Sequence, residues 1–206
     1  LLRQGLRLTV YIGLPASVGL CLVGHPLART IYYGVGAIEA DDARRVAWVL
    51  LGYAPAVWAY SMNHVLTRTF YAREDAVTPA RVAAGMVGLN LALNLLLIWP
   101  LGAAGLALST AVCAIGQTVV LGRLVRRHAD RPVDGEVIGS WARTIAGSVI
   151  MAAVVIAVLR PFDVAALAWV KVAGLLLAAV VAGGVTFAAI SLLTGQTEPR
   201  WLLRKT

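Results

Sequence analysis

Residues 82–122 read VAAGMVGLNLALNLLLIWPLGAAGLALSTAVCAIGQTVVLG, a run without a charged side chain between Arg81 and Arg123. A helix needs roughly 20 apolar residues to cross the hydrocarbon core of a bilayer, and this run is about twice that long. Trp99-Pro100-Leu101-Gly102 interrupts it with a turn signal and an aromatic residue typical of a membrane interface. The run therefore predicts two spanning helices joined by a short turn.

Four further charge-free runs are each long enough for one spanning helix. The whole chain is 60% hydrophobic and only 14% charged, with a mean hydropathy of +0.80, whereas soluble domains carry about 25% charged residues. Helices are the expected spanning form, because the alternating pattern of a membrane β-strand is absent. We predict an all-α transmembrane bundle of about six spans, over residues 8–28, 46–67, 82–99, 103–122, 144–159 and 172–193.

Basic residues are distributed unevenly between the two sides of the predicted bundle, and the side that holds both termini carries most of them. The positive-inside rule therefore places both termini in the cytoplasm. A net charge of +8 could indicate nucleic-acid binding, but these residues lie at helix ends, so anionic lipid headgroups at the cytoplasmic face are the expected partner and nucleic acid is not. The cytoplasmic set is Arg3, Arg7, Arg68, Arg73, Arg81, Arg123, Arg126, Arg127, Arg131, Arg143, Arg200, Arg204 and Lys205.

Polar side chains inside the predicted spans are few. Asn90 and Asn94 are spaced i, i+4 and share one face of a helix, and Gln117 lies in the next span. These amides either join helices by hydrogen bonds or line a polar cavity. His64, near the inner end of its span, is either a functional group or an interfacial hydrogen-bonding residue. Pro55 lies inside the second span and favours a kink there.

Enzyme signatures are absent from the sequence: it contains no HExxH, GxSxG or P-loop motif. Glu74-Asp75 is an acidic pair on an inner loop, but no second acidic cluster follows at helical spacing to hold a divalent metal. We therefore expect no catalytic residues, no metal site and no cofactor, and no enzymatic activity.

The inner loop 69–79 reads TFYAREDAVTP, with an aromatic pair followed by an acidic residue and by Thr-Pro before the next span. This pattern resembles the signature loop of the MurJ/MviN family of lipid II flippases. Residues 5–16 resemble a helix of that family's second half, and residues 100–109 resemble its tight outer turn and the helix that follows. The candidate site residues carried by this resemblance are Phe70, Tyr71, Arg73, Asp75, Thr78 and Pro79.

The resemblance implies a two-lobed flippase of about fourteen helices that works by alternating access. Such a protein moves lipid II, the undecaprenyl-linked peptidoglycan precursor, across the bacterial cytoplasmic membrane during peptidoglycan biosynthesis and cell-shape maintenance. Residues 1–127 would be helices of its second lobe, 128–143 a cytoplasmic connection, and 144–206 two C-terminal helices and a cytoplasmic tail. Because the chain starts at Leu1 and not at Met, we expect a fragment whose N-terminal lobe, with the cationic substrate site, is missing.

Two roles for the signature loop remain open. In the structural one, Thr78 is the N-cap and Pro79 lies in the first turn of the following helix, Asp75 accepts backbone hydrogen bonds, and Phe70 and Tyr71 anchor the helix end at the interface. In the other, the loop gates movement between the lobes, with its arginines contacting the other lobe or lipid headgroups.

Two other functions are also compatible with the sequence. A related exporter of the same superfamily would move lipid-linked oligosaccharides or drugs, although a drug antiporter usually has an intramembrane acidic residue, which the predicted spans lack. A membrane scaffold would not transport at all.

Overall fold

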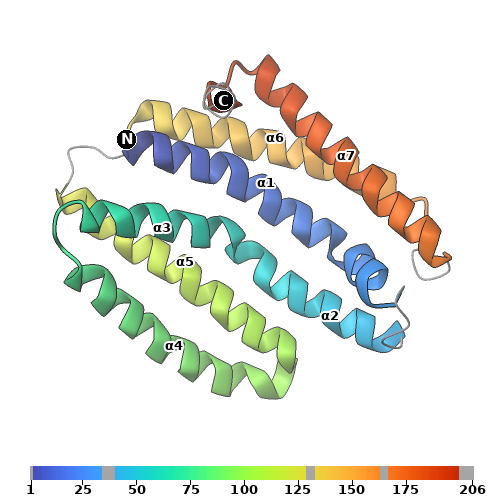
Figure 1. Ribbon diagram of the computed structural model, residues 1–206, viewed down its shortest axis with the longest axis horizontal. Helices are drawn as coiled ribbons and strands as arrows, with labels where there is room; N and C mark the ends of the chain where they lie inside the picture. The colour runs from blue at the N-terminus through green and yellow to red at the C-terminus, as the bar shows by residue number, and fades with distance from the viewer. Residues whose placement is uncertain (1, 34–39, 129–132, 163–166, 200–206) are drawn as a thin grey trace.

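The computed structural model describes residues 2–33, 40–128, 133–162 and 167–199, and the structural statements below concern these residues. Seven α-helices make up most of this part of the chain (Figure 1). A π-helical turn, Arg29–Tyr33, extends the first helix, and a 3-10 turn, Ala54–Ala56, separates the second helix from the third. The helices are α1 Leu2–Ala28, α2 Ala40–Tyr53, α3 Val57–Tyr71, α4 Val77–Leu101, α5 Ala103–His128, α6 Gly135–Leu159 and α7 Trp169–Leu193.

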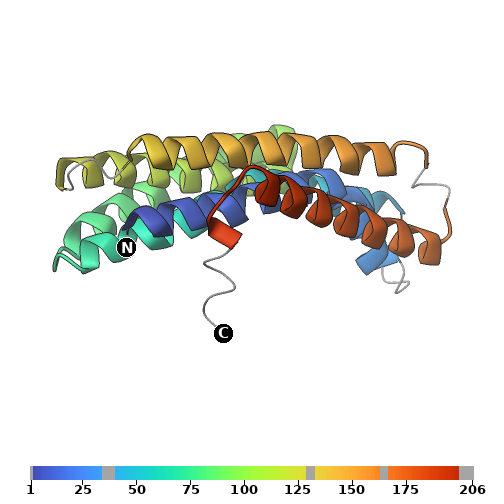
Figure 2. The same cartoon turned by 90° about the horizontal axis from the view of Figure 1, so that it is seen from above.

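Helix α1 lies at the centre of the arrangement. On one side it packs against α2 and α3, which in turn contact α5, and α4 covers the far side of α5. On its other side α1 packs against the hairpin of α6 and α7. Seen from above, the helices form a flat slab (Figure 2). The all-helical bundle is therefore confirmed, with the C-terminal hairpin held by α1 and not by α4.

Five of the six predicted spans are confirmed as single helices long and apolar enough to cross a membrane. They extend beyond the predicted bounds because arginines at their ends, such as Arg3 and Arg126, continue the helix, and long basic side chains can reach an interface from there. The fifth span shows this most clearly. It begins at Gly135 and not near residue 144, with Asp134 accepting a hydrogen bond from the backbone of Val137 at 3.0 Å as its N-cap. Most of the predicted connection 128–143 is therefore helix.

The second predicted span, residues 46–67, is helical along its length but changes helix type at Pro55, where the sequence predicts a kink. Proline has no backbone N–H to continue an α-helix, and at Pro55 the chain forms a 3-10 turn that divides the span into α2 and α3. The two pieces follow one another along the bundle beside α1 (Figure 1). Helix α2 starts at Ala40, before the predicted start of this span at residue 46.

The break at Pro55 is stabilised by α1. The hydroxyl Oγ of Ser17 accepts a hydrogen bond from the backbone N–H of Trp58 at 3.2 Å, which satisfies a donor freed near the break. One turn earlier on α1, Gly13 lets the two backbones approach closely: a Cβ built there would lie 2.8 Å from the Cα of Trp58. Small side chains thus join α1 to the kinked segment.

Three buried clusters hold the slab together. One joins α1, α3 and α5 near the signature-loop end, and a second joins α1 to α6 and α7. The third consists of alanines that let α5 approach the α2–α3 segment closely. Their buried members are Leu6, Val10, Met62, Leu66, Phe70, Leu121 and Val125; Val23, Met151, Val155 and Ala179; and Ala56, Ala59, Ala111 and Ala114.

Candidate functional site

The signature loop begins with a tight end to α3. The backbone N–H of Asp75 donates to the carbonyl of Phe70 at 3.1 Å, and that of Glu74 donates to Tyr71 at 3.0 Å, which is the Schellman pattern of a helix C-terminus. Glu74 has a φ of +62°, the left-handed conformation that glycine usually supplies. The same pair of hydrogen bonds ends α7 around Gly195, where the residue is a glycine with φ +64°.

Asp75 then starts the next helix. Its Oδ1 accepts a hydrogen bond from the backbone N–H of Thr78 at 2.9 Å. This agrees with the structural role predicted for the signature loop, in which Asp75 accepts backbone hydrogen bonds. The prediction of Thr78 as the N-cap is wrong: α4 begins at Val77, and Thr78 contributes its backbone N–H to the cap and not its side chain. Pro79 is buried in the first turn of α4, as predicted.

The two aromatic residues before the loop have different surroundings. Phe70 is buried among α1, α3 and α5 residues, so it is a core residue and not the interfacial anchor that we predicted. Tyr71 is 55% exposed and is free to lie at an interface. At the end of α3, Phe70 thus packs in the core and its neighbour Tyr71 lies at the surface. Arg73, which follows the helix, is also exposed.

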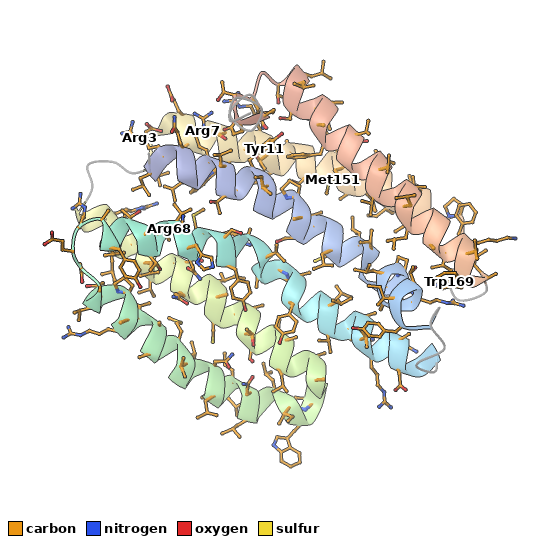
Figure 3. All side chains as sticks on the ribbon, viewed as in Figure 1. Arg3, Arg7, Tyr11, Arg68, Met151 and Trp169 are labelled. Atoms are coloured by element: carbon orange, nitrogen blue, oxygen red, sulfur yellow. The ribbon has the colours of Figure 1, made fainter. Side chains whose placement is uncertain are left out.

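A polar hollow of about 500 Å³ lies between α3 and α5 next to the signature loop. It brings His64 and Gln117, which the sequence singled out separately, together with Arg68, whose place on α3 is labelled in Figure 3. Neither Arg73 nor Arg81 lines it. The lining residues are Tyr60, Asn63, His64, Thr67, Arg68, Tyr71 and Gln117.

The other predicted polar residues join helices. Asn90 Nδ2 donates to the hydroxyl of Ser109 at 3.3 Å, and Asn94 Nδ2 donates to Asn90 Oδ1 at 3.0 Å. Ser109 in turn donates to Asn94 Oδ1, which closes a network between α4 and α5. The structure thus shows the helix-joining alternative for this amide pair.

A charged network that the sequence analysis missed lies at the same end of the bundle. Arg7 Nε donates to Glu198 Oε1 at 2.7 Å, Arg7 Nη2 donates to Thr197 Oγ1 at 3.0 Å, and Ser140 Oγ donates to Glu198 Oε1 at 2.5 Å. Glu198 is completely buried, and its second oxygen, Oε2, has no hydrogen-bond partner in the described part of the chain. Arg3 and Arg7 extend from α1 beside α6 in Figure 3. The network ties α1, α6 and the segment after α7 together.

The Glu198 carboxyl is held in its charged form. Burial raises the pKa of this group, but hydrogen bonds from Ser140 and Arg7, with the positive charge of Arg7, outweigh burial and hold the pKa below its ordinary value. The only sequence signal for this pair is that Glu198 is an acidic residue among the basic residues of the tail. Residues 200–206 of that tail lie outside the described residues.

Within the described residues, no group of three or more His, Cys, Asp or Glu side chains is placed to hold a metal ion. The site consists of a capped loop, a polar hollow and a buried ion pair, all at the end of the bundle where α1 begins. Such an arrangement can orient helices and bind polar or anionic groups.

Comparisons with known proteins identify the family. The family model described as "Lipid II flippase MurJ" matches residues 1–180. The chain belongs to the MurJ lipid II flippase family. This is a family of transporters and not of enzymes. The chain is 32% identical to the probable lipid II flippase MurJ of Synechocystis over 142 residues, which cover 68% of this chain and 26% of the relative.

Other MurJ proteins give similar values. The chain is 28% identical to the probable lipid II flippase MurJ of Vibrio cholerae over 58% of its length and 30% identical to the lipid II flippase MurJ of Burkholderia cenocepacia over 59%. These alignments cover 22% and 23% of the relatives, so the chain spans about a quarter of their length. A solved structure of MurJ in an inward closed conformation has the same fold, with a TM-score of 0.79 at 21% identity over 94% of this chain and 38% of the other.

Replacing Asp75 by alanine is expected to destabilise the protein by about 1 kcal/mol, the usual effect of removing a helix cap. The matched control is Thr78→Ala, which leaves the backbone N–H donor in place and should change stability little. The measurement is the midpoint of denaturant unfolding of the whole protein in detergent. Equal effects of the two variants would contradict a capping role for the Asp75 carboxylate.

Proposed function

We propose that this chain is part of a transporter that moves lipid II across the bacterial cytoplasmic membrane by alternating access, during peptidoglycan biosynthesis and cell-shape maintenance. The observation that carries the proposal is the match of the lipid II flippase family model to residues 1–180. The undecaprenyl-linked precursor is then the transported partner. The absence of a catalytic signature in the sequence fits a function that breaks no bond of its substrate.

The chain would contribute two parts to that transporter. Residues 1–127 would be second-lobe helices, and residues 144–206, joined through 128–143, the C-terminal pair and the tail. The partner of this unit would be a first lobe that holds the cationic substrate site. The attachment of α6 and α7 to α1 supports a single rigid unit, which a rocking mechanism needs.

Charge distribution supports an orientation with both termini in the cytoplasm. One end of the bundle contains the start of α1, the signature loop and the end of α5, and most described basic residues lie there. Their proposed partners at that face are anionic lipid headgroups. These residues are Arg3, Arg7, Arg68, Arg73, Arg81, Arg123, Arg126 and Arg143.

Reconstitution tests the transport function. The whole protein is placed in vesicles that contain fluorescent lipid II, and the fraction of labelled headgroups accessible to an impermeant quencher is followed with time. Protein-dependent exposure of lipid II supports the proposal. Exposure of another lipid-linked oligosaccharide but not of lipid II would favour the related exporter, and no exposure of either would favour the scaffold.

The signature loop provides a sharper prediction within that assay. If the loop sets the inner end of a rocking bundle, then Asp75→Ala should slow lipid II exposure by about fivefold, the equivalent of about 1 kcal/mol in the barrier. Thr78→Ala again serves as the control, since its side chain takes no part in the cap. Wild-type rates for Asp75→Ala at equal protein levels would rule out this role of the loop.

A further inference from the structure

A second hollow, of about 300 Å³, lies where α1, α3 and α5 meet the start of α6. It shares no lining residue with the polar hollow beside the signature loop. Its wall is mostly apolar and is built on the largest buried cluster of the protein. Its aliphatic and Met lining residues include Leu6, Val10, Met62, Leu66, Val119 and Val125.

The rim of this hollow is strongly basic on one side. Arg123 and Arg126 line it from the last turns of α5, both are exposed, and neither makes an ion pair with another described residue. Trp141 of α6 lines it as well, and its indole Nε1–H is buried without a hydrogen-bond partner in the described part of the chain. Two cations and an unused donor therefore border an apolar cavity.

We propose that this hollow binds a phospholipid with an anionic headgroup, with part of one acyl chain against the apolar wall. The lipid phosphate would accept hydrogen bonds from Arg123 and Arg126, which make no ion pair with another described residue, and from the indole of Trp141. Such a ligand satisfies both halves of the site, since a free anion would leave the apolar wall uncovered and a neutral hydrocarbon would leave the arginines and the indole unpaired.

The position of the hollow agrees with this ligand. It lies at the end of the bundle proposed to face the cytoplasm, where anionic lipids attract basic side chains, and in that respect it rests on the proposed orientation. The hollow has free space at Gly122, one of its lining residues, because a Cβ built there meets no atom within 4 Å. A side chain at this position would occupy the space that the lipid needs without colliding with the protein.

Native mass spectrometry of the whole protein in detergent tests the site without any transport assay. Phosphatidylglycerol is titrated, phosphatidylcholine is the neutral comparison, and the affinities of the first bound lipid are compared. Gly122→Leu should fill the hollow, Arg123→Gln with Arg126→Gln should remove the rim charge, and Trp141→Phe should remove the donor. The matched controls are Gly88→Leu on α4 and Arg45→Gln on α2, at exposed positions that do not line the hollow, and Arg45 is not among the arginines proposed to contact lipid headgroups at the cytoplasmic face.

We expect tighter binding of phosphatidylglycerol than of phosphatidylcholine, with about a tenfold loss for the double arginine variant and for Gly122→Leu. Trp141→Phe should lose several-fold, and the two control variants should bind as the wild type does. Equal binding of the two lipids, or wild-type binding by Gly122→Leu and the double arginine variant, would overturn the proposal. Displacement of phosphatidylglycerol by lipid II one-for-one at this site would also overturn it, by assigning the hollow to the transported lipid. Because none of these readouts requires flipping, failure of the transport proposal leaves the result interpretable.

Discussion

Replacing Arg7 by alanine is expected to destabilise the protein by about 3–5 kcal/mol, because the Glu198 carboxylate would remain buried without its cation. Glu198 is 0% exposed and the Arg7 side chain 14% exposed, so water cannot readily replace the lost partner. The measurement is the denaturant midpoint of the whole protein in detergent. A double variant, Arg7→Leu with Glu198→Leu, should recover most of the loss, because no unpaired charge is then buried.

Arg3 provides the matched control. It also lies in the first turns of α1 and forms an ion pair of 2.8 Å with Asp134, but the two side chains are 54% and 25% exposed. Arg3→Ala should therefore cost at most about 1 kcal/mol, as exposed pairs usually do. Similar losses for Arg3→Ala and Arg7→Ala would mean that the Glu198 carboxylate is not buried as the structure has it.

The same pair gives a defined pH dependence. The pKa of Glu198 is lowered in the folded protein by its hydrogen bonds from Ser140 and Arg7 and by the charge of Arg7, against the effect of burial. A carboxyl with a lowered folded pKa contributes stability above its unfolded pKa and loses it as the pH falls through the folded value. Glu198→Gln should thus be less stable than the wild type at neutral pH, and the difference should shrink in acid.

Leucine at Gly13 is the second substitution with a large expected effect. A Cβ there would lie 2.8 Å from the backbone Cα of Trp58, and the backbone cannot rotate away as a side chain can. Forcing α1 and α3 apart would also break the hydrogen bond from Trp58 N–H to Ser17 at the Pro55 turn. We expect a loss at the upper end of the about 1–3 kcal/mol typical of overpacking, measured by thermal unfolding in detergent.

Gly19, on the same helix, is the control for this substitution. A Cβ at Gly19 would meet no atom within 4 Å, so Gly19→Leu adds no collision and increases helix propensity. It should leave the unfolding temperature unchanged or raise it slightly. If Gly13→Leu were equally harmless, the close contact between α1 and α3 would not contribute to stability.

Much of the fold could be predicted from charge-free runs alone. The run between Arg81 and Arg123 becomes α4 and α5, with the turn at Gly102 where Trp99-Pro100-Leu101-Gly102 indicated it. Such runs report where a backbone can lie in lipid, which is a local property of the sequence. The predicted bounds were too short because an arginine ends a hydrophobic run without ending a helix.

Other features depend on contacts between residues far apart in the sequence, and charge-free runs could not predict them. Pro55 indicated the kink, but its contacts with α1, through the Ser17 hydroxyl and the close approach at Gly13, have no local sign in the sequence. Within the candidate site, the capping role of Asp75 was predicted from local turn chemistry, whereas the burial of Phe70 depends on α1 and α5. Glu198 gave no local sign of its partner, because Arg7 lies 191 positions away in the chain.

That separation has a consequence for biogenesis. A ribosome adds about 5–20 residues per second, so Arg7 is made about 10–40 s before Glu198. Throughout that interval the Arg7 side chain of α1 has no Glu198 carboxylate to pair with. The contact between Arg7 and Glu198 thus forms only after all the residues between them have been translated.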